Sequence, residues 1–241
     1  SFPTRRSSDL IGSIQPIQAI SDLLANEPTI SFHVDAVQAI GKVPVSSYLT
    51  DRVDFATFSG HKFHAVRGVG FVYKKAGKKI TPLLTGGGQE KDLRSTTENV
   101  AGIASMAKAL RLVTDKEALS LTKIAKMKKV IFDELSKYED ITLFSGEGDN
   151  FAPNILTFGI KGVRGEVVVH AFEEHQIYIS TTSACSSKAG KPAGTLISMG
   201  VPSKLAQTAV RISLDDDNDM GQVEQFLTIF KQVYAKTQKV R

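Results

Sequence analysis

One stretch decides the fold: Val53-Asp54-Phe55-Ala56-Thr57-Phe58-Ser59-Gly60-His61-Lys62. Its apolar, β-prone part predicts a strand, and Ser59-Gly60-His61-Lys62 follows where that strand ends. A lysine there brings one amine to a defined point at a sheet edge, beside hydroxyl, backbone N–H and imidazole donors. An enzyme needs these groups to hold an aldehyde cofactor as a Schiff base and to grip its phosphate. The alternative is that Lys62 is an ordinary surface lysine.

Predicted strands and short helices alternate around this stretch. The hydrophobic pattern predicts helices at residues 16–24 and 36–40, and strands at residues 30–34, 53–58 and 69–73. Such alternation indicates an α/β fold with a sheet that is largely parallel. In sheets of this kind, ligands collect at the carboxyl ends of the strands.

Asp35 and Lys62 both follow predicted strands, so both fall where a ligand site is expected. A carboxylate at this place keeps a pyridine nitrogen protonated, which makes the ring an electron sink. Gln38, one helical turn later, offers a donor to a phenolic oxygen on that ring. The alternative for Asp35 is a helix N-cap, and the two roles are compatible.

The run Ser95-Thr96-Thr97-Glu98 predicts a capping box that opens a helix through residue 113. The box accounts for Ser95 and Glu98 and leaves the Thr97 hydroxyl free at a helix N-terminus, which is a natural anion site. By itself, the run Gly86-Gly87-Gly88 predicts a structural loop.

The pattern after residue 113 predicts a second domain, which begins with a lysine-rich helix and contains Cys185 and Arg211. A lone cysteine is most often a small buried hydrophobe, but Cys185 lies among hydroxyl residues in a run that predicts a mobile loop. Lys188 and Lys191 nearby favour its thiolate form, which indicates an exposed, activated thiol. Arg211 interrupts an apolar strand, so it is expected to face solvent or to bind a carboxylate.

Length and composition describe an ordinary globular protein of 241 residues, 41% of them hydrophobic, with a formal net charge of +5. No apolar run is long enough to span a membrane, and the single cysteine excludes an internal disulfide and fits a reducing cytoplasm. We expect no direct nucleic-acid binding, because lysines of the predicted helix typically form a solvated face. These are Lys116, Lys123, Lys126, Lys128 and Lys129.

Six motifs together resemble the NifS-like cysteine desulfurases, in the class V aminotransferase branch of fold-type I pyridoxal-phosphate enzymes. They occur in family order from Ile11 almost to the end of the chain. The motifs are His33-Val34-Asp35-Ala36-Val37-Gln38, Ser59-Gly60-His61-Lys62-Phe63-His64, Gly86-Gly87-Gly88-Gln89-Glu90, Thr97-Glu98-Asn99-Val100, Ser183-Ala184-Cys185-Ser186-Ser187 and Val210-Arg211-Ile212-Ser213-Leu214.

The resemblance implies a role for each candidate residue. Lys62 would be the Schiff-base lysine and Cys185 the nucleophile that takes sulfur from L-cysteine, leaving L-alanine and a persulfide. Asp35 would be the partner of the pyridine nitrogen, and Gln38 would donate to the phenolic oxygen. Ser59 and His61 would bind the phosphate, and Thr97 would bind the phosphate of the other subunit's cofactor. Arg211 would bind the substrate carboxylate.

The resemblance also implies a domain plan. Residues 1–10 look like a translated sequencing adapter, so we exclude them as non-native and expect an N-terminally truncated protein. Residues 11–113 would be the C-terminal portion of a large, mostly parallel α/β domain that binds the cofactor. Residues 114–241 would be a small α+β domain that carries the cysteine loop.

The implied partners are a second copy of the chain, as a homodimer, and a sulfur acceptor. The form of the cysteine motif looks like the subgroup that hands sulfur to Fe–S scaffold or tRNA/thiamine sulfurtransferase proteins, in the cytoplasm. Two alternatives remain open at this point. One is another class V enzyme, such as a selenocysteine lyase or an aminotransferase, and the other is an inactive fragment that lacks the N-terminal half of its site.

Overall fold

The computed structural model describes residues 7–181 and 194–238, so Cys185 lies outside the described residues. The chain divides into two units, which we treat separately. The N-terminal unit is Pro16–Glu117, and the C-terminal unit combines the described residues up to Gln15 with those from Ala118 on. The predicted boundary falls after residue 113, and the prediction assigns residues 11–15 to the first domain.

The stretch before Gly12 forms a helix, α1 (Ser7–Ile11), where the sequence predicted no element. Leu10 and Ile11 are 6% and 4% exposed and pack against Leu196 and Ala206. This burial against residues far along the chain explains why the first described residues belong to the C-terminal unit.

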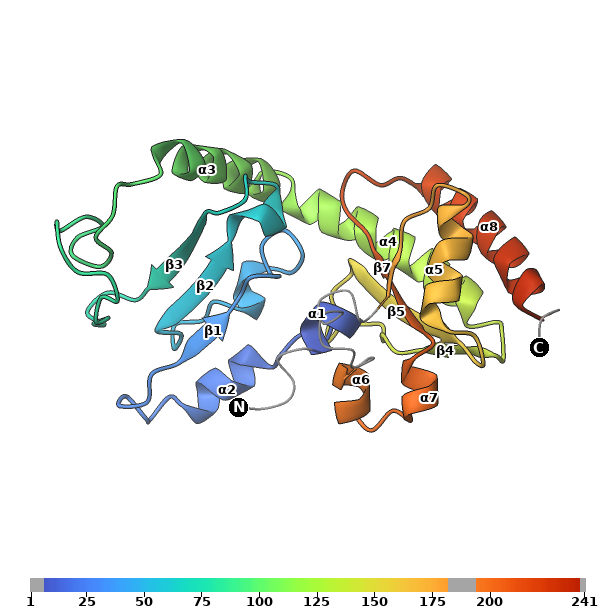
Figure 1. Cartoon of the computed structure of the whole chain (residues 1–241). Coiled ribbons are helices and arrows are strands. Elements are labelled where there is room, and N and C mark those ends of the chain that lie inside the picture. The colour runs from blue at the N-terminus through green and yellow to red at the C-terminus, as the bar shows by residue number, and fades with distance from the viewer. Residues whose placement is uncertain (1–6, 182–193, 239–241) are drawn as a thin grey trace. The chain divides into compact units, whose positions relative to one another are not determined.

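The N-terminal unit is built on a three-stranded sheet in the order β1-β2-β3 (Figure 1). The β1–β2 pair is parallel and the β2–β3 pair is antiparallel. Its elements, with η for a 3-10 helix, are α2 (Ile17–Leu23), β1 (His33–Asp35), η2 (Val45–Ser47), β2 (Phe55–Ser59), η3 (Gly60–Phe63), β3 (Gly70–Lys74) and α3 (Val100–Thr114).

Strand β2 forms because alternate residues face the core of the unit. Ala56 and Phe58 are buried, and the Phe58 ring stacks on Phe71 of β3 with 4.4 Å between centroids. The predictions of α2, β2 and β3 are confirmed to within two residues at each end.

Strand β1 is shorter than predicted, because side chains satisfy much of the backbone in the loop before it. The Arg52 guanidinium donates to the carbonyls of Leu24, Glu27 and Ile30. The backbone N–H of Phe32, which directly precedes β1, donates to a carboxylate of the next strand region at 2.9 Å. A backbone segment held in this way has no need of a ladder partner.

That carboxylate belongs to Asp54, which is buried and surrounded by donors. Arg52 Nη1 lies 2.9 Å and Lys78 Nζ 3.0 Å from its oxygens. Burial alone raises the pKa of Asp54, but the hydrogen bonds from Phe32, Lys78 and Arg52 outweigh it and hold the pKa at about 2. The charged form of Asp54 is therefore part of the fold of this unit.

The C-terminal unit is built on an antiparallel sheet in the order β4-β5-β7-β6, with α4, α5 and α8 contributing to its main core (Figure 1). Its elements after α1 are α4 (Glu117–Leu135), β4 (Ile141–Leu143), β5 (Ile155–Ile160), α5 (Gly165–Glu173), β6 (Ser180–Thr181), α6 (Gly194–Ser198), α7 (Ser203–Ala206), β7 (Ala209–Ser213) and α8 (Met220–Gln238).

Strand β5 is buried along its whole length because both of its faces are covered. Leu156, Phe158 and Ile160 point into the core shared with the helices. Thr157 points the other way and donates through its hydroxyl to the carbonyl of Leu10 in α1. The period of two in this strand thus separates two packed surfaces.

Helix α4 corrects the prediction that all of its lysines lie on a solvated face. Lys128 is buried, at 4% exposure, and it follows the helical spacing of Ile124, Met127 and Ile131 on the core side. Its Nζ donates to the carbonyl of Ala152 at 2.9 Å. Burial lowers the pKa of Lys128 to about 8, although nearby Glu147 acts in the opposite direction.

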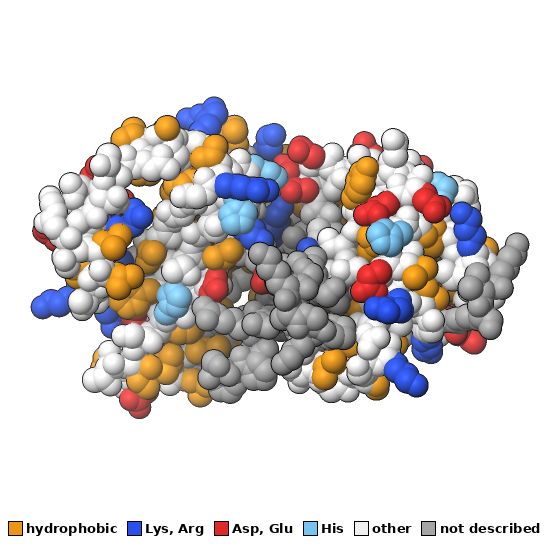
Figure 2. All heavy atoms as spheres, in the orientation of Figure 1, with side chains coloured by type: hydrophobic (Ala, Val, Ile, Leu, Met, Phe, Trp, Pro, Cys, Tyr) orange, Lys and Arg blue, Asp and Glu red, His pale blue; other side chains and the backbone are white. Residues whose placement is uncertain are grey.

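On the face shown in Figure 2, the C-terminal unit carries acidic side chains interspersed with basic ones rather than a single basic patch. The described helices include none that combines the length and the apolar character needed to cross a membrane.

Candidate active site

The carboxyl ends of β1 and β2 bring two predicted site residues to one edge of the N-terminal sheet. Asp35 is the last residue of β1, and Ser59 is the last residue of β2. The two strands run parallel with Asp35 opposite Thr57, and the N–H of Ala36 donates to the carbonyl of Thr57 at 3.0 Å. The side chains of Asp35 and Ser59 thus belong to adjacent strand ends, as the rule for α/β sheets predicts.

His61 and Lys62 follow Ser59 on η3, a single turn of 3-10 helix. The Ser59 hydroxyl and His61 Nδ1 lie 2.8 Å apart, in hydrogen-bonding contact. His61 is exposed, whereas Lys62 is half-buried. The sequence Ser-Gly-His-Lys therefore places a hydroxyl, an imidazole and an amine on one short turn.

Gly60 allows this turn to fold closely onto the loop that precedes β3. Its N–H donates to the carbonyl of Val69 at 2.9 Å. A Cβ at this position would lie 3.0 Å from the same carbonyl oxygen and 3.1 Å from the Ala65 Cβ. His64 then ends the turn in the left-handed conformation, with φ of 69°.

The segment after Asp35 is a turn, so the prediction of a helix at residues 36–40 is wrong. The Asp35 carboxylate accepts a hydrogen bond from the N–H of Val37 at 3.2 Å, as aspartate commonly does in turns. Gln38 is half-buried in this turn, three residues after Asp35. The two residues remain close along the chain without a helix between them.

Thr97 is exposed in the segment before α3, and the predicted capping box around it is wrong. The helix begins at Val100, and its N-cap is Asn99, whose side-chain oxygen accepts from the N–H of Gly102 at 3.0 Å. Thr97 therefore lies before the cap, outside the first helical turn.

Arg211 lies on β7 of the C-terminal unit, away in sequence from the other candidates. Its Nη1 donates to the backbone carbonyl of Asp9 at 2.8 Å. Its Nε is buried, and no hydrogen-bond partner for it exists within the described residues. The guanidinium is thus anchored on one side and retains an unmet donor, which suits an acceptor such as a carboxylate.

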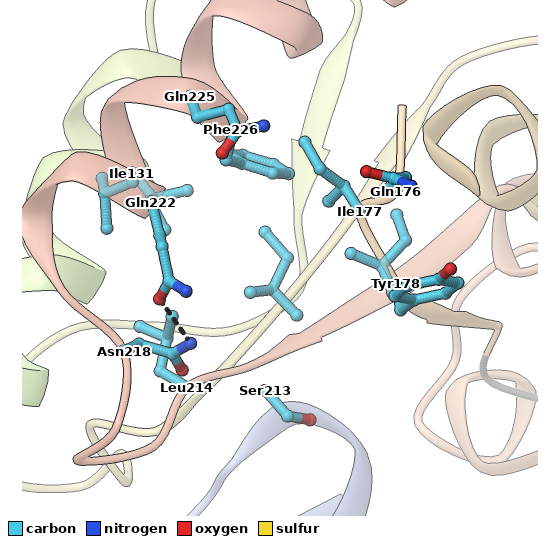
Figure 3. A pocket seen from close by; sticks show the side chains of 13 residues that line it. Ile131, Gln176, Ile177, Tyr178, Ser213, Leu214, Asn218, Gln222, Gln225 and Phe226 are labelled. Carbon is cyan, nitrogen blue, oxygen red and sulfur yellow. Dashed lines mark hydrogen bonds between the residues drawn. The ribbon is translucent and has the colours of Figure 1, made fainter. Parts of the chain in front are cut away.

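The C-terminal unit also has a cavity of about 320 Å³ that contains none of the predicted site residues (Figure 3). Ile131 and Phe226 contribute apolar surface to it, and Gln176, Asn218 and Gln222 contribute amides. Asn218 donates to Gln222 at 2.9 Å, so these two amides already bind one another. None of the described residues that line it has a charged side chain.

The chain belongs to the aminotransferase class-V family, whose model matches residues 5–226. It is 47% identical to a NifS/IcsS protein homolog of Lactobacillus delbrueckii subsp. bulgaricus over 95% of the chain and 60% of that protein. It is 37% identical to the cysteine desulfurase IscS of Dictyoglomus turgidum over 85% of the chain and 51% of that protein. Among solved structures, a NifS-like protein superposes with a TM-score of 0.81 at 31% identity, over 94% of the chain and 58% of that structure.

These matches confirm the resemblance to the NifS-like branch, the mixed α/β fold of the fold-type I enzymes, and pyridoxal phosphate as the cofactor of the family. The chain spans roughly half to three-fifths of the length of the relatives described above.

The residues at the N-terminal sheet edge fit this cofactor chemically. Ser59 and His61 offer hydroxyl and imidazole donors to a phosphate, and Lys62 offers an amine on the same turn. Asp35 adds a carboxylate from the neighbouring parallel strand, which suits a cationic ring nitrogen. The donor set thus contains an amine for the aldehyde, donors for the phosphate and a carboxylate for the ring nitrogen.

Proposed function

We propose that the protein is a cysteine desulfurase that uses pyridoxal 5′-phosphate to remove sulfur from L-cysteine, giving L-alanine. The observation that carries this proposal is the joining of Asp35 and the Ser59–His61–Lys62 turn at one edge of a parallel strand pair. The names of the relatives support the reaction over that of an aminotransferase or a selenocysteine lyase.

When bound, pyridoxal phosphate supplies an aldehyde that captures amines and a cationic ring that withdraws electrons. In this chain, Lys62 would hold the aldehyde through its Nζ, and once released it would move the Cα proton of the substrate. Asp35 would keep the ring nitrogen protonated, and Gln38 would donate to the phenolic oxygen. Ser59 and His61 would bind the phosphate.

Two residues of the C-terminal unit would handle the substrate itself. Arg211 would bind the carboxylate of L-cysteine, and its Nε, which has no partner among the described residues, supports that role. The Cys185 thiolate would attack the sulfur of the substrate and form a sulfur–sulfur bond. The carbon–sulfur bond of cysteine would break, and its electron pair would remain on the carbon that becomes the methyl group of alanine.

The partners follow from this chemistry. The persulfide on Cys185 must be passed to a thiol acceptor, which we propose is an Fe–S scaffold protein or a sulfurtransferase for tRNA or thiamine. We further propose that the protein is a homodimer in the cytoplasm, with Thr97 reaching the cofactor phosphate of the partner subunit. The exposed position of Thr97, outside a helix cap, is compatible with that role.

Covalent trapping tests the cofactor part of this proposal. The protein is mixed with pyridoxal phosphate, reduced with borohydride, digested and mapped by mass spectrometry. We expect the label on the peptide that contains Lys62, and we expect Lys62→Ala to abolish it. The matched control is Lys79→Ala, which removes an exposed lysine of the same unit and should leave the label unchanged. Labelling spread over many lysines, and insensitive to Lys62→Ala, would contradict the assignment.

Sulfur transfer is tested with L-cysteine that carries radioactive sulfur. We expect the label to remain on the protein through a bond that a reducing thiol cleaves, and to be absent in Cys185→Ser. Alanine formation that is equal in the wild type and in Cys185→Ser would instead favour a reaction that has no use for this thiol.

A further inference from the structure

Residues 9–14 are bonded to the rest of the C-terminal unit by a series of hydrogen bonds made by their backbone. The carbonyl of Asp9 accepts from Arg211, and that of Gly12 accepts from the N–H of Ala152 at 2.7 Å. The N–H of Ile14 donates to the carbonyl of Asn150 at 2.8 Å. The segment thus connects the loop at residues 150–152 to the guanidinium on β7.

Lys128 holds the other side of that loop. Its Nζ donates to the carbonyl of Ala152, whose own N–H donates to Gly12, and it lies 5.8 Å from the centroid of the Phe151 ring. Ala152 is therefore bonded on one side to a buried cation and on the other to residues 9–14. Loss of the Lys128 bond would leave a carbonyl without its donor beside this connection.

We propose that Lys128 is a positioning residue for Arg211, acting through Ala152, Gly12 and the carbonyl of Asp9. This rests on the proposed role of Arg211 as the ligand of the substrate carboxylate. A carboxylate is bound best by two parallel N–H groups, so the plane of the guanidinium decides the direction of approach. The carbonyl at position 9 is a backbone group that any residue there supplies, so this contact does not depend on the adapter-like side chains. It holds Nη1 and thereby restrains that plane, while Nε has no partner within the described residues.

The burial of Lys128 adds a dependence on pH. Because burial lowers its pKa to about 8, the ammonium loses its charge within the physiological to mildly alkaline range. A neutral amine is a weaker donor than an ammonium, so the bond to Ala152 weakens as pH rises through that value. Glu147, the charged group that acts against this lowering of the Lys128 pKa, also pairs with Lys129 at 3.6 Å.

Nuclear magnetic resonance of the full chain tests the proposal through two signals. One is the hydrogen exchange rate of the Ile14 amide, and the other is the chemical shift of the Arg211 Nε–H. At pH 7, we expect Lys128→Met to speed Ile14 exchange by about tenfold, as for loss of one charge-assisted hydrogen bond, and to shift the Arg211 signal. The matched control is Lys129→Met, at an exposed position one residue on, which should leave both signals unchanged.

A second measurement needs no substitution at Lys128. Between pH 7 and pH 9, the Arg211 signal of the wild type and of Lys129→Met should move with a midpoint near 8. An Arg211 signal that is indifferent both to Lys128→Met and to this pH change would overturn the proposal. Should Lys128→Met fail to fold, Lys128→Gln replaces it in both measurements, because its shorter neutral side chain also removes the ammonium bond to Ala152.

Titration with L-alanine, as a carboxylate probe, separates this proposal from the proposed role of Arg211. If L-alanine leaves the Arg211 Nε–H of the wild type unmoved, Arg211 is not a carboxylate ligand under those conditions. The effect of Lys128 on the free guanidinium would still be read from the first two signals. If L-alanine binds, Lys128→Met should weaken its affinity about tenfold, and Lys129→Met should not.

Discussion

Among the described residues, each of the two units buries one charged residue, and the two are stabilised in different ways. Asp54 of the N-terminal unit is surrounded by the Phe32 N–H, Arg52 and Lys78. Lys128 of the C-terminal unit has a neutral carbonyl and the face of an aromatic ring. Both pKa values fall, but for Asp54 this means that the fold favours the charge, and for Lys128 that the fold opposes it. Compensation by partners, rather than burial itself, decides whether a buried charge supports a fold.

The largest effect should come from the apolar core of the C-terminal unit, because this core and not Lys128 supplies its stability. Phe158 of β5 is fully buried. We expect Phe158→Ala to lower the free energy of unfolding of this unit by about 4 kcal/mol through lost burial and the cavity left behind. Urea denaturation combined with hydrogen exchange measures it, and Val167→Ala, at an exposed position on α5, is the control. A loss below about 1 kcal/mol would mean that Phe158 is not packed as described.

In the N-terminal unit, the Asp54 network should matter almost as much. Asp54→Ala leaves two cations and the Phe32 N–H without their acceptor, and we expect it to cost about 3 kcal/mol. The loop before β1 should lose amide protection first. The control is Asp51→Ala, which removes an exposed carboxylate from the same region. Equal losses of stability in the two variants would show that the buried network stabilises the unit no more than an exposed carboxylate does.

The pH dependence of stability should separate the two buried charges. The pKa of Asp54 is about 2 in the fold and 3.8 unperturbed, so its stabilisation is present above pH 3.8 and is lost as the pH falls toward 2. Lys128 has a pKa of about 8 in the fold and 10.5 unperturbed. The unfolded chain therefore binds more protons between these values, and stability rises with pH from 8 to 10.

Thermal denaturation at a series of pH values measures how stability changes in both pH ranges. Asp54→Ala should reduce the loss of stability between pH 3.8 and 2. Lys128→Met should reduce the gain in stability between pH 8 and 10. Above pH 10 the trend should reverse, because burial, with a smaller effect of Glu117, raises the pKa of Tyr48 to about 12. A wild-type profile without a rise above pH 8 would contradict the burial of Lys128.

The smallest effect distinguishes the observed cap of α3 from the predicted one. Asn99→Ala removes the oxygen that accepts from Gly102 and should cost about 1 kcal/mol. Glu98→Ala removes a member of the predicted capping box, which the structure does not form, and should change stability by less than 0.5 kcal/mol, roughly the limit for surface substitutions. Urea denaturation, followed by circular dichroism, measures both effects. A larger loss of stability for Glu98→Ala than for Asn99→Ala would favour the predicted capping box over the Asn99 cap.

Prediction from sequence succeeded where neighbouring residues carry the signal. The run that ends in Ser59-Gly60-His61-Lys62 alternates as a strand should, and the structure has β2 followed by a turn there. It was wrong at residues 36–40 and at Ser95–Glu98, where the local sequence is compatible with more than one local structure. The burial of Lys128 was readable from its spacing with Ile124 and Ile131, but lysine-rich helices usually face water.

The sequence by itself determined the family, the lysine-bearing turn and the strand before it, because each depends on residues close together in the chain. The tertiary structure alone decided that Asp35 and Ser59 end adjacent parallel strands, since strand pairing joins residues distant in sequence. It also decided that Arg211 is anchored by the carbonyl of Asp9, 202 residues earlier. Every residue has a backbone carbonyl, so the order of side chains in the sequence does not predict such a contact.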